Sequence, residues 1–362
     1  PIEVTASTGA VTFIDDDVLA VLTAAGELVH VRLGVPPVVG TPIVDVADGG
    51  LISNDGSAFT EIADDRWVVV SLPDGERTDH GDARSVSMLQ GIADDIILRF
   101  DRASGDVERF DDGELTYRTS LSDLIVPTAT GLGQGFRIGH GVVLLHFRDF
   151  SNVDNASGQV IAVDVDTGEV VGELAVPDSR RAELISADEF VHGDFQGGAT
   201  VRSFDGTVVE RLPPFASSVQ SFAGTQSGDV LVGLDDGTTL LWSRGDQRVV
   251  RRLDGPPLPV VSVQEASDGT IVVQHGSGQI VLWWPDSDDI GSEVVGPVGF
   301  TGLAQVVDER VMVSVAGRVV EIPLDVAEWR AIACASARGP VDPTRWRAAT
   351  DTDPPETSPC EL

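Results

Sequence analysis

The stretch from Asp268 to Asp288 reads "DGTIVVQHGSGQIVLWWPDSD", and its two short apolar runs on either side of a glycine turn decide the fold. The stretch from Gly228 to Gln247, "GDVLVGLDDGTTLLWSRGDQ", has the same order: an apolar run, a turn that ends in glycine, and a second apolar run with a tryptophan five residues after the glycine. Short apolar runs bounded by turn residues are typical of β-strands joined in a hairpin. The turn glycine therefore serves as the phase marker of a repeat.

The marker recurs along most of the chain. An eighth position falls at Asp65, in "AFTEIADDRWVVVSL", and the eight markers are spaced 39, 40, 53, 40, 39, 41 and 39 residues apart. The long step contains "RDFSNVDNASG", an expanded turn. The glycine markers are Gly26, Gly105, Gly158, Gly198, Gly237, Gly278 and Gly317. A period near 40 with several short strands in each unit indicates a β-propeller, in which small sheets stack around an axis.

The number of markers and the two ends of the pattern determine how the ring is expected to close. Eight markers favour eight blades, and seven blades is the alternative if residues 36–84 form an elaborated connection. The last unit ends after Ile322 without an outer strand, and Ile2–Ala6 is an extended run before the first unit. Pairing this run with the last unit would satisfy backbone groups that are otherwise unpaired. The sequence thus predicts an all-β fold: a single β-propeller over residues 1–324, closed by the N-terminal strand.

Residues 325–362 differ from the repeat and predict a short helical tail packed on the propeller. Asp325 and Glu328 have the spacing of a helix N-cap and its third helical residue, and apolar residues at helical spacing follow, among them Trp329. Asp342 and Pro343 predict the start of a second short helix.

The spacing from the marker glycine to tryptophan resembles that of WD-repeat propellers. The pattern departs from that family where Trp242 and Trp283 are followed by Ser243 and Trp284 instead of aspartate. The resemblance therefore implies a WD-like propeller. The repeated pair Trp242 and Trp283 is expected to pack between blades because it obeys the period, whereas Trp284 does not obey it and is the candidate for exposure.

The tail resembles the ending that follows propellers in actinobacterial STAND-type signalling NTPases. The matching residues, in order, are Trp329, Ala333-Cys334, Trp346 and Cys360. The stretch "RGPVDPT" replaces the sequence usual in that family between the first cysteine and the second tryptophan. The resemblance implies a C-terminal sensing or docking module whose enzyme lies upstream. No G-x-x-x-x-G-K-[ST] motif is present, so this chain is not itself the ATPase.

Cys334 and Cys360 are the only cysteines. They either pair as a disulfide that pins the tail or remain two buried thiols, and the redox state of the compartment decides between these outcomes. The sequence leaves the compartment open between cytoplasmic and extracytoplasmic.

Charge limits the classes of partner. The chain has 58 Asp and Glu against 24 basic residues, a net charge of -34, and every basic residue is arginine. This surface repels phosphate backbones, so we expect no nucleic-acid partner, and it favours a protein or a small cationic ligand. No apolar run approaches the ~18 residues of a membrane span, so no membrane insertion is expected. We expect the isolated domain to be a monomer.

The sequence lacks the common catalytic and metal-binding motifs. It contains no H-E-x-x-H, C-x-x-C or G-x-S-x-G, and its six histidines have no metal-ligand spacing. We therefore predict no catalytic residue, no metal and no cofactor.

Binding residues are instead expected in a loop. The expansion at 146–158 breaks the repeat and mixes a cation, carboxylates and an aromatic residue, as binding loops on rigid scaffolds do; its other interpretation is a tolerated surface insertion. His275 belongs to the same class of loop in another blade and is expected on the same face. The candidate binding residues are His146, Arg148, Asp149, Phe150, Asn152, Asp154, His275 and Trp284.

These features favour a non-enzymatic propeller for protein interaction or ligand sensing, as part of a larger bacterial signalling protein. The alternative is a propeller enzyme, a metal-dependent hydrolase or lyase with its site at the channel mouth, which the abundance of aspartate suggests.

Overall fold

The structure is a computed structural model. It describes residues 10–15, 18–22, 28–32, 41–46, 50–72, 74–82, 88–93, 96–101, 104–125, 135–148, 158–176, 179–194, 197–285, 292–295, 303–315, 317–325 and 328. All the elements of this part of the chain are β-strands, β1 to β31.

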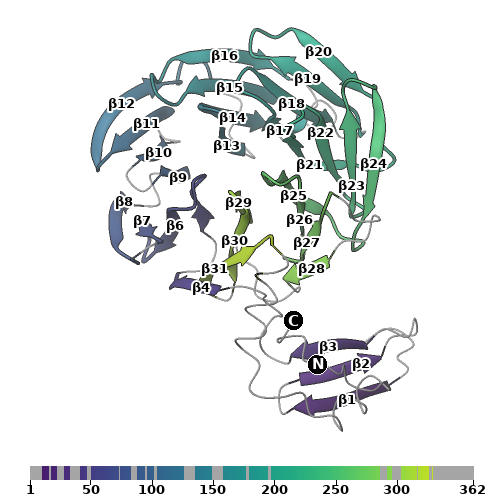
Figure 1. Ribbon diagram of the computed structural model, residues 1–362. Helices are drawn as coiled ribbons and strands as arrows, with labels where there is room; N and C mark the ends of the chain where they lie inside the picture. Colours follow the sequence, from purple (N-terminus) through teal and green to yellow (C-terminus); the bar gives the residue numbers. More distant parts are fainter. Residues whose placement is uncertain are drawn as a thin grey trace.

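Seven four-stranded antiparallel sheets, named blades I to VII, form a ring (Figure 1). Blade I consists of β5 (Leu51–Ile52), β6 (Ala58–Ala63), β7 (Arg66–Ser71) and β8 (Arg77–Asp82). Blade II consists of β9 (Met88–Ala93), β10 (Ile96–Asp101), β11 (Asp106–Asp111) and β12 (Glu114–Ser120). Blade III consists of β13 (Gly135–Gly139), β14 (Val142–Arg148), β15 (Gly158–Asp164) and β16 (Val170–Ala175).

Blades IV to VII continue in chain order. Blade IV consists of β17 (Ser179–Leu184), β18 (Glu189–Asp194), β19 (Ala199–Ser203) and β20 (Val208–Leu212). Blade V consists of β21 (Val219–Gly224), β22 (Val230–Leu234), β23 (Thr238–Ser243) and β24 (Arg248–Asp254). Blade VI consists of β25 (Val260–Glu265), β26 (Ile271–His275), β27 (Ile280–Trp283) and β28 (Ser292–Val295). Blade VII consists of β29 (Gln305–Val307), β30 (Arg310–Val315), β31 (Arg318–Pro323) and β4 (Thr41–Asp45).

The expectation of eight blades is wrong, because the first predicted unit is not part of the ring. Its strands β1 (Ala10–Asp15), β2 (Val18–Leu22) and β3 (Leu28–Arg32) form a three-stranded sheet that pairs with no blade strand in the described residues. Figure 1 shows this sheet outside the ring. Residues 51–82 form a complete blade rather than an elaborated connection. A hairpin pattern is local, so it looks the same in a blade and in a separate sheet.

An N-terminal segment closes the ring, but it is not the predicted one. The outer strand of blade VII is β4, whose Val44 and Asp45 lie opposite Val319 and Arg318 of β31. The Val46 amide donates to the Gly317 carbonyl at 2.8 Å. Pro42 is tolerated because β4 is an edge strand, where a missing N–H costs no ladder bond. The predicted segment Ile2–Ala6 lies outside the described residues.

Seven of the eight marker positions lie in or beside the turn between the second and third strands of a blade, and the eighth, Gly26, falls outside the described residues. Gly237 and Gly278 have φ values of 89° and 85°, a conformation in which a glycine avoids the cost of a Cβ. In blade I the equivalent position is Asp65, with φ 63°.

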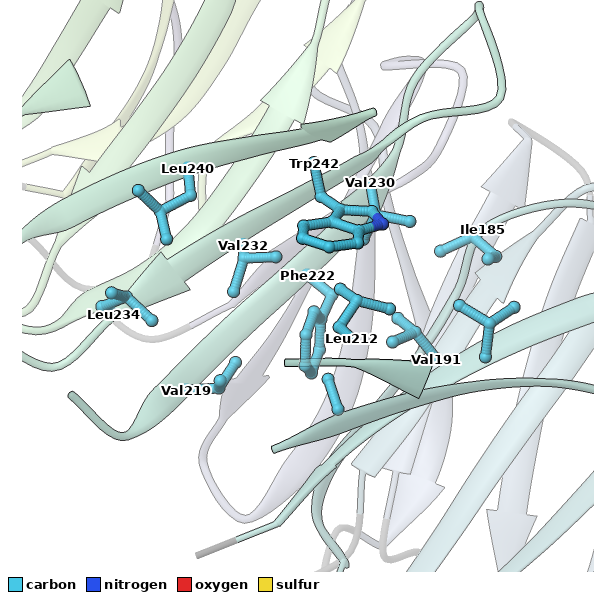
Figure 2. Close-up of a cluster of buried hydrophobic side chains, with 12 residues drawn as sticks. Ile185, Val191, Leu212, Val219, Phe222, Val230, Val232, Leu234, Leu240 and Trp242 are labelled. Atoms are coloured by element: carbon cyan, nitrogen blue, oxygen red, sulfur yellow. The ribbon is translucent and has the colours of Figure 1, made fainter. Parts of the chain in front are cut away.

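Hydrophobic clusters between neighbouring blades form the core. Trp242 packs with residues of blades IV and V, such as Leu212 and Phe222, as Figure 2 shows. Trp283 is fully buried with Leu231 and other residues of blades V and VI. The expectation that both tryptophans pack between blades is therefore confirmed.

The predicted helical tail at 325–362 falls outside the described residues except for Asp325 and Glu328, and both cysteines, Cys334 and Cys360, lie in the undescribed part. Among the described residues, no helix has the length and apolar character needed to cross a membrane.

One buried histidine makes stability depend on pH. His192 of β18 accepts a hydrogen bond at Nε2 from Arg202 Nε at 3.2 Å. Burial, and then the charge of Arg202, lower the pKa of His192 to about 4. The unfolded chain binds a proton below about pH 6.5 and the folded chain only below about pH 4. Stability present above pH 6.5 is therefore lost as the pH falls toward 4, by about 3 kcal/mol in all.

The prediction is that His192→Gln removes this part of the pH dependence of the free energy of unfolding, measured by urea titration between pH 7 and 4. His140→Asn is the matched control, because His140 is exposed in a turn with φ 52°. Parallel pH curves for His192→Gln and the unchanged chain would contradict the prediction.

Candidate interaction site in the central channel

The first strand of each blade is the innermost one, and these strands line the central channel (Figure 1). A cavity of about 460 Å³ lies there, with walls from β5, β13, β17, β21, β25 and β29. Asn54 and His140 also line it, and both belong to turns between a first and a second strand. The cavity therefore reaches the end of the channel at which these turns lie.

An ion pair between two blades lies in the wall of the cavity. Arg137 Nε of β13 donates to Glu183 Oε1 and Oε2 of β17, at 2.8 and 2.7 Å. Both residues line the cavity, and their side chains are 29% and 13% exposed. The ion pair fixes the relative position of two first strands and leaves a planar guanidinium and a carboxylate at the surface of the cavity.

Side-chain amides join other blades in the same wall. Gln264 of β25 donates through Nε2 to the Ala304 carbonyl at 2.6 Å and accepts at Oε1 from the Val306 amide at 2.9 Å. The Gln274 side chain accepts from the Ala304 amide at 2.9 Å. Asn54 Nδ2 donates to the Ile138 carbonyl, two blades away, at 3.0 Å. These bonds join different blades and make the wall a preformed surface.

The polar groups of this wall are suited to recognition. Ser262 and Gln305 add a hydroxyl and a side-chain amide. Glu265 adds a carboxylate, which accepts a hydrogen bond from the backbone N–H of Gln226 at 2.6 Å. Within the described ranges, no three His, Cys, Asp or Glu side chains form a group that could hold a metal ion. The wall presents hydrogen-bonding groups from several blades to whatever enters the channel.

The predicted residues His146 and His275 lie at the other end of the blades. Each is near the end of a second strand, beside the turn to the third strand, in blades III and VI. Both are buried. His275 Nδ1 lies 3.2 Å from the Leu258 carbonyl, and burial lowers the pKa of its imidazole. Because adjacent strands are antiparallel, this end is opposite to the one with Asn54 and His140.

Trp284 is placed apart from His275, although both belong to blade VI. It directly follows β27, and Trp283 pairs with Ile271 at the far end of β26 from His275. Trp284 is half-buried against the core cluster between blades VI and VII, and its indole N–H donates to the Leu324 carbonyl at 3.2 Å. The structure therefore does not bring Trp284 and His275 into one site.

The other predicted residues belong to the expanded turn. Arg148 is the last residue of β14. The positions outside the described residues are Asp149, Phe150, Asn152 and Asp154. The binding role of this loop stays a prediction.

The residues of the cavity wall were not found from the sequence. Three polar residues of the wall stand in strands that also contain apolar residues: Arg137, Glu183 and Gln264. A signal exists in principle, because all three belong to the first strand of a unit, the one that follows an inter-blade connection. Polar residues in the first strands could be grouped once the strand order is known.

Comparisons with known proteins identify the fold. No protein-family description matches the chain, and no curated protein matches its sequence. Among solved structures, the WD40 β-propeller domain of Doa1 is similar, with a TM-score of 0.59, 13% identity, and coverage of 80% of this chain and 98% of that domain. Hsv2 of Kluyveromyces lactis has a TM-score of 0.53 and 10% identity over 75% of this chain and 91% of its own. Hsv2 of Kluyvelomyces marxianus has a TM-score of 0.54 and 10% identity over 75% and 90%.

These identities show the fold alone. The described part of the chain forms a seven-bladed, all-β propeller similar to WD40 propellers, together with the separate sheet β1–β3. The resemblance to WD-repeat propellers is therefore confirmed for the fold. The resemblance of the tail to the ending of STAND-type NTPases stays a prediction.

Proposed function

We propose that this chain is a non-enzymatic interaction propeller that binds a segment of a partner protein at the channel end containing Asn54 and His140. The observation that carries the proposal is the cavity of about 460 Å³, whose wall combines hydrogen-bonding groups from six blades. A segment that enters it meets several rigid strands at once, as recognition sites on rigid scaffolds do.

Charge supports a basic partner. The net charge of the chain is -34, and Glu183 and Glu265 line the cavity together with the single cation Arg137 among its described lining residues. A basic segment would be steered toward this surface and would find carboxylate acceptors in the wall. A small cationic ligand meets the same requirement. A sensing role within a larger bacterial signalling protein rests on the tail motif alone and belongs to the proposal.

The experiment uses the full chain as bait in a lysate of its native host, with bound proteins quantified by mass spectrometry. Ser262→Trp places a large side chain in the cavity and should lower recovery of a specific partner by about tenfold, the loss expected when one central contact is removed. Ser120→Trp is the matched control, because Ser120 is exposed on the outer strand β12.

A third bait replaces residues 148–155 with a short Gly-Ser turn. Under this proposal the bait with the replaced loop recovers the partner within about twofold of the amount that the unchanged chain recovers. The proposal would be contradicted if the bait with the replaced loop no longer recovered the partner while Ser262→Trp recovered it unchanged. That result would place the site at the opposite end of the channel. All baits must unfold within about 2 °C of one another for the comparison to apply.

A further inference from the structure

A groove of about 350 Å³, named the seam groove, lies at the place where the ring closes. The closing strand β4 contributes Ile43 to it, blade I contributes Asp55, and blade VII contributes Asp308. Figure 1 shows β4 beside β31 at this point of the ring. Asp55 and Asp308 belong to turns between a first and a second strand, so the seam groove opens at the channel end that contains Asn54.

The floor of the seam groove is apolar. Leu72 and Met312 line it, are 3% and 6% exposed, and belong to the hydrophobic core between blades VII and I. Ile43 and Val307 also line it and are half-buried against the same core. Apolar surface that remains at such a groove is covered favourably by a large apolar side chain.

Two carboxylates stand at the edge of this floor. Asp55 and Asp308 are exposed, and neither forms an ion pair with any described residue. Glu321, the third carboxylate of the seam groove, already pairs with Arg310 at 2.9 Å. The seam groove therefore suits an apolar side chain that is accompanied by a cation.

The C-terminal part of the chain leaves the propeller beside the seam groove. Pro323, the last residue of β31, lies opposite Arg310 in the ladder of blade VII. The Leu324 amide then donates to the Glu309 carbonyl at 2.9 Å. Glu328, the last described residue, accepts at Oε2 from Arg310 Nη2 at 3.2 Å. Because Arg310 also lines the seam groove, the chain stands at the edge of the groove where residue 329 begins.

The residues that follow match the seam groove in chemistry. Residue 329 is a tryptophan, and residues 329–350 contain four arginines and one aspartate, a net charge of +3 in a chain of net charge -34. The arginines are Arg330, Arg338, Arg345 and Arg347. This segment therefore brings a large apolar side chain and positive charge to the edge of an apolar groove that carries carboxylates.

We propose that the seam groove is the docking site of the chain's own C-terminal segment. Trp329 covers the apolar floor, and the arginines that follow it pair with Asp55 and Asp308. Because Ile43 belongs to the closing strand, this docking joins the two ends of the propeller sequence across the closure. The segment is tied to the propeller at Glu328, so its effective concentration at the groove is high. The proposal stands independently of partner binding in the channel.

The test is the reactivity of a thiol placed in the seam groove of the full chain. Val307→Cys is pulsed with N-ethylmaleimide, and labelling is read by mass spectrometry of the peptide that contains residue 307, so Cys334 and Cys360 stay unchanged. Trp329→Ala is expected to raise the labelling rate by at least about tenfold, because the open groove exposes the thiol. Trp346→Ala makes the same change further along the segment and should leave the rate within about twofold. An unchanged rate in Trp329→Ala, or an equal rise in Trp346→Ala, would overturn the proposal.

A second pair of variants tests the carboxylates. Asp55→Asn/Asp308→Asn removes both charges and is expected to raise labelling at residue 307 by about threefold or more, through the loss of two exposed ion pairs. Asp64→Asn/Asp65→Asn is the matched control, because it removes two charges from the exposed β6–β7 turn at the opposite end of blade I. Equal rates in the two double variants would contradict the proposal. This comparison also decides the case in which Trp329→Ala fails to fold, which thermal unfolding detects.

The other occupants to distinguish are the segment of a second copy and a segment of another protein. Docking within one chain predicts that Val307→Cys is labelled at least about tenfold more slowly than the exposed Ser120→Cys, at about 1 μM as at about 50 μM. Slow labelling only at the higher concentration would assign the seam groove to a second copy. Labelling as fast as that of Ser120→Cys at both concentrations would leave the groove open for another protein. Either result would overturn the proposal.

Discussion

Trp283→Ala is expected to lower the free energy of unfolding by about 4 kcal/mol. The Trp283 side chain is 0% exposed and packs with Leu231 and Leu253 of the neighbouring blade V, so its removal leaves a cavity at the interface between two blades. Because the blades are rigid sheets, the interface cannot collapse to fill the space, and the cost of the cavity adds to the lost burial.

Trp284→Ala is the matched control for this prediction. It deletes the same side chain one position further on, where the tryptophan is half-buried and its N–H donates to the Leu324 carbonyl. Its expected cost is about 1–2 kcal/mol, from one hydrogen bond and partial burial. Urea unfolding followed by circular dichroism measures both values. Equal losses in the two variants would show that Trp283 does not hold two blades together.

The sequence determined the local units of this fold well. The two apolar runs around seven of the eight markers became the second and third strands of a blade, even at Asp65, where no glycine marks the turn. The period also separated Trp242 and Trp283 from Trp284, since a residue that recurs with the period occupies an equivalent place in each blade. The positions of the strands and the equivalence of the two tryptophans both depend on residues close together in the chain. Strand pattern and turn residues predict structure best over such short distances.

The number of blades could not be obtained in the same way. Strands β1 to β3 have the hairpin pattern of a blade, and only their pairing partners distinguish them from one. The closing contact joins Asp45 to Arg318, 273 residues apart. Both Ile2–Ala6 and Thr41–Asp45 read as extended runs, so the choice between them depends on packing against blade VII rather than on local preference.

The candidate site was missed for a related reason. Arg137 and Glu183 meet across two blades, and Gln264 meets Ala304 and Val306 across two others. None of these pairs is visible as a motif, because each partner lies in a different repeat unit. The loop at 146–158 stood out in the sequence because it breaks the period, whereas the cavity wall keeps the period and differs only in polarity.

Removal of the closing strand is expected to have the largest effect on stability. A chain that starts at residue 47 loses β4, including the ladder to β31 and the packing of Ile43, Val44 and Val46 against blades I and VII. Burial of these side chains alone contributes about 4 kcal/mol, and the open ring also exposes the edge of β31. A chain that starts at residue 41 retains β4 and loses the sheet of β1–β3.

The two truncated chains are compared by thermal unfolding. Since β1–β3 pair with no blade strand in the described residues, the chain that starts at residue 41 should unfold within about 2 °C of the full chain. The chain that starts at residue 47 should unfold several degrees lower or fail to fold. A large loss already on removal of residues 1–40 would mean that the earlier segment closes the ring.

The most direct test of the closure is a covalent link between β4 and β31. Asp45 and Arg318 lie opposite each other in the antiparallel ladder and form an ion pair at 2.9 Å. Opposed residues of such a ladder have Cα atoms about 4.5–5.5 Å apart, within the range that a disulfide spans. The experiment is mild oxidation of Asp45→Cys/Arg318→Cys in a Cys334→Ser/Cys360→Ser background, followed by mass spectrometry of the proteolytic peptides. A ring closed by β4 predicts a single intramolecular cross-linked peptide, which is absent from the control pair Asp45→Cys/Arg310→Cys. Free thiols at both positions, or equal cross-linking in the control, would contradict a ring closed by Thr41–Asp45.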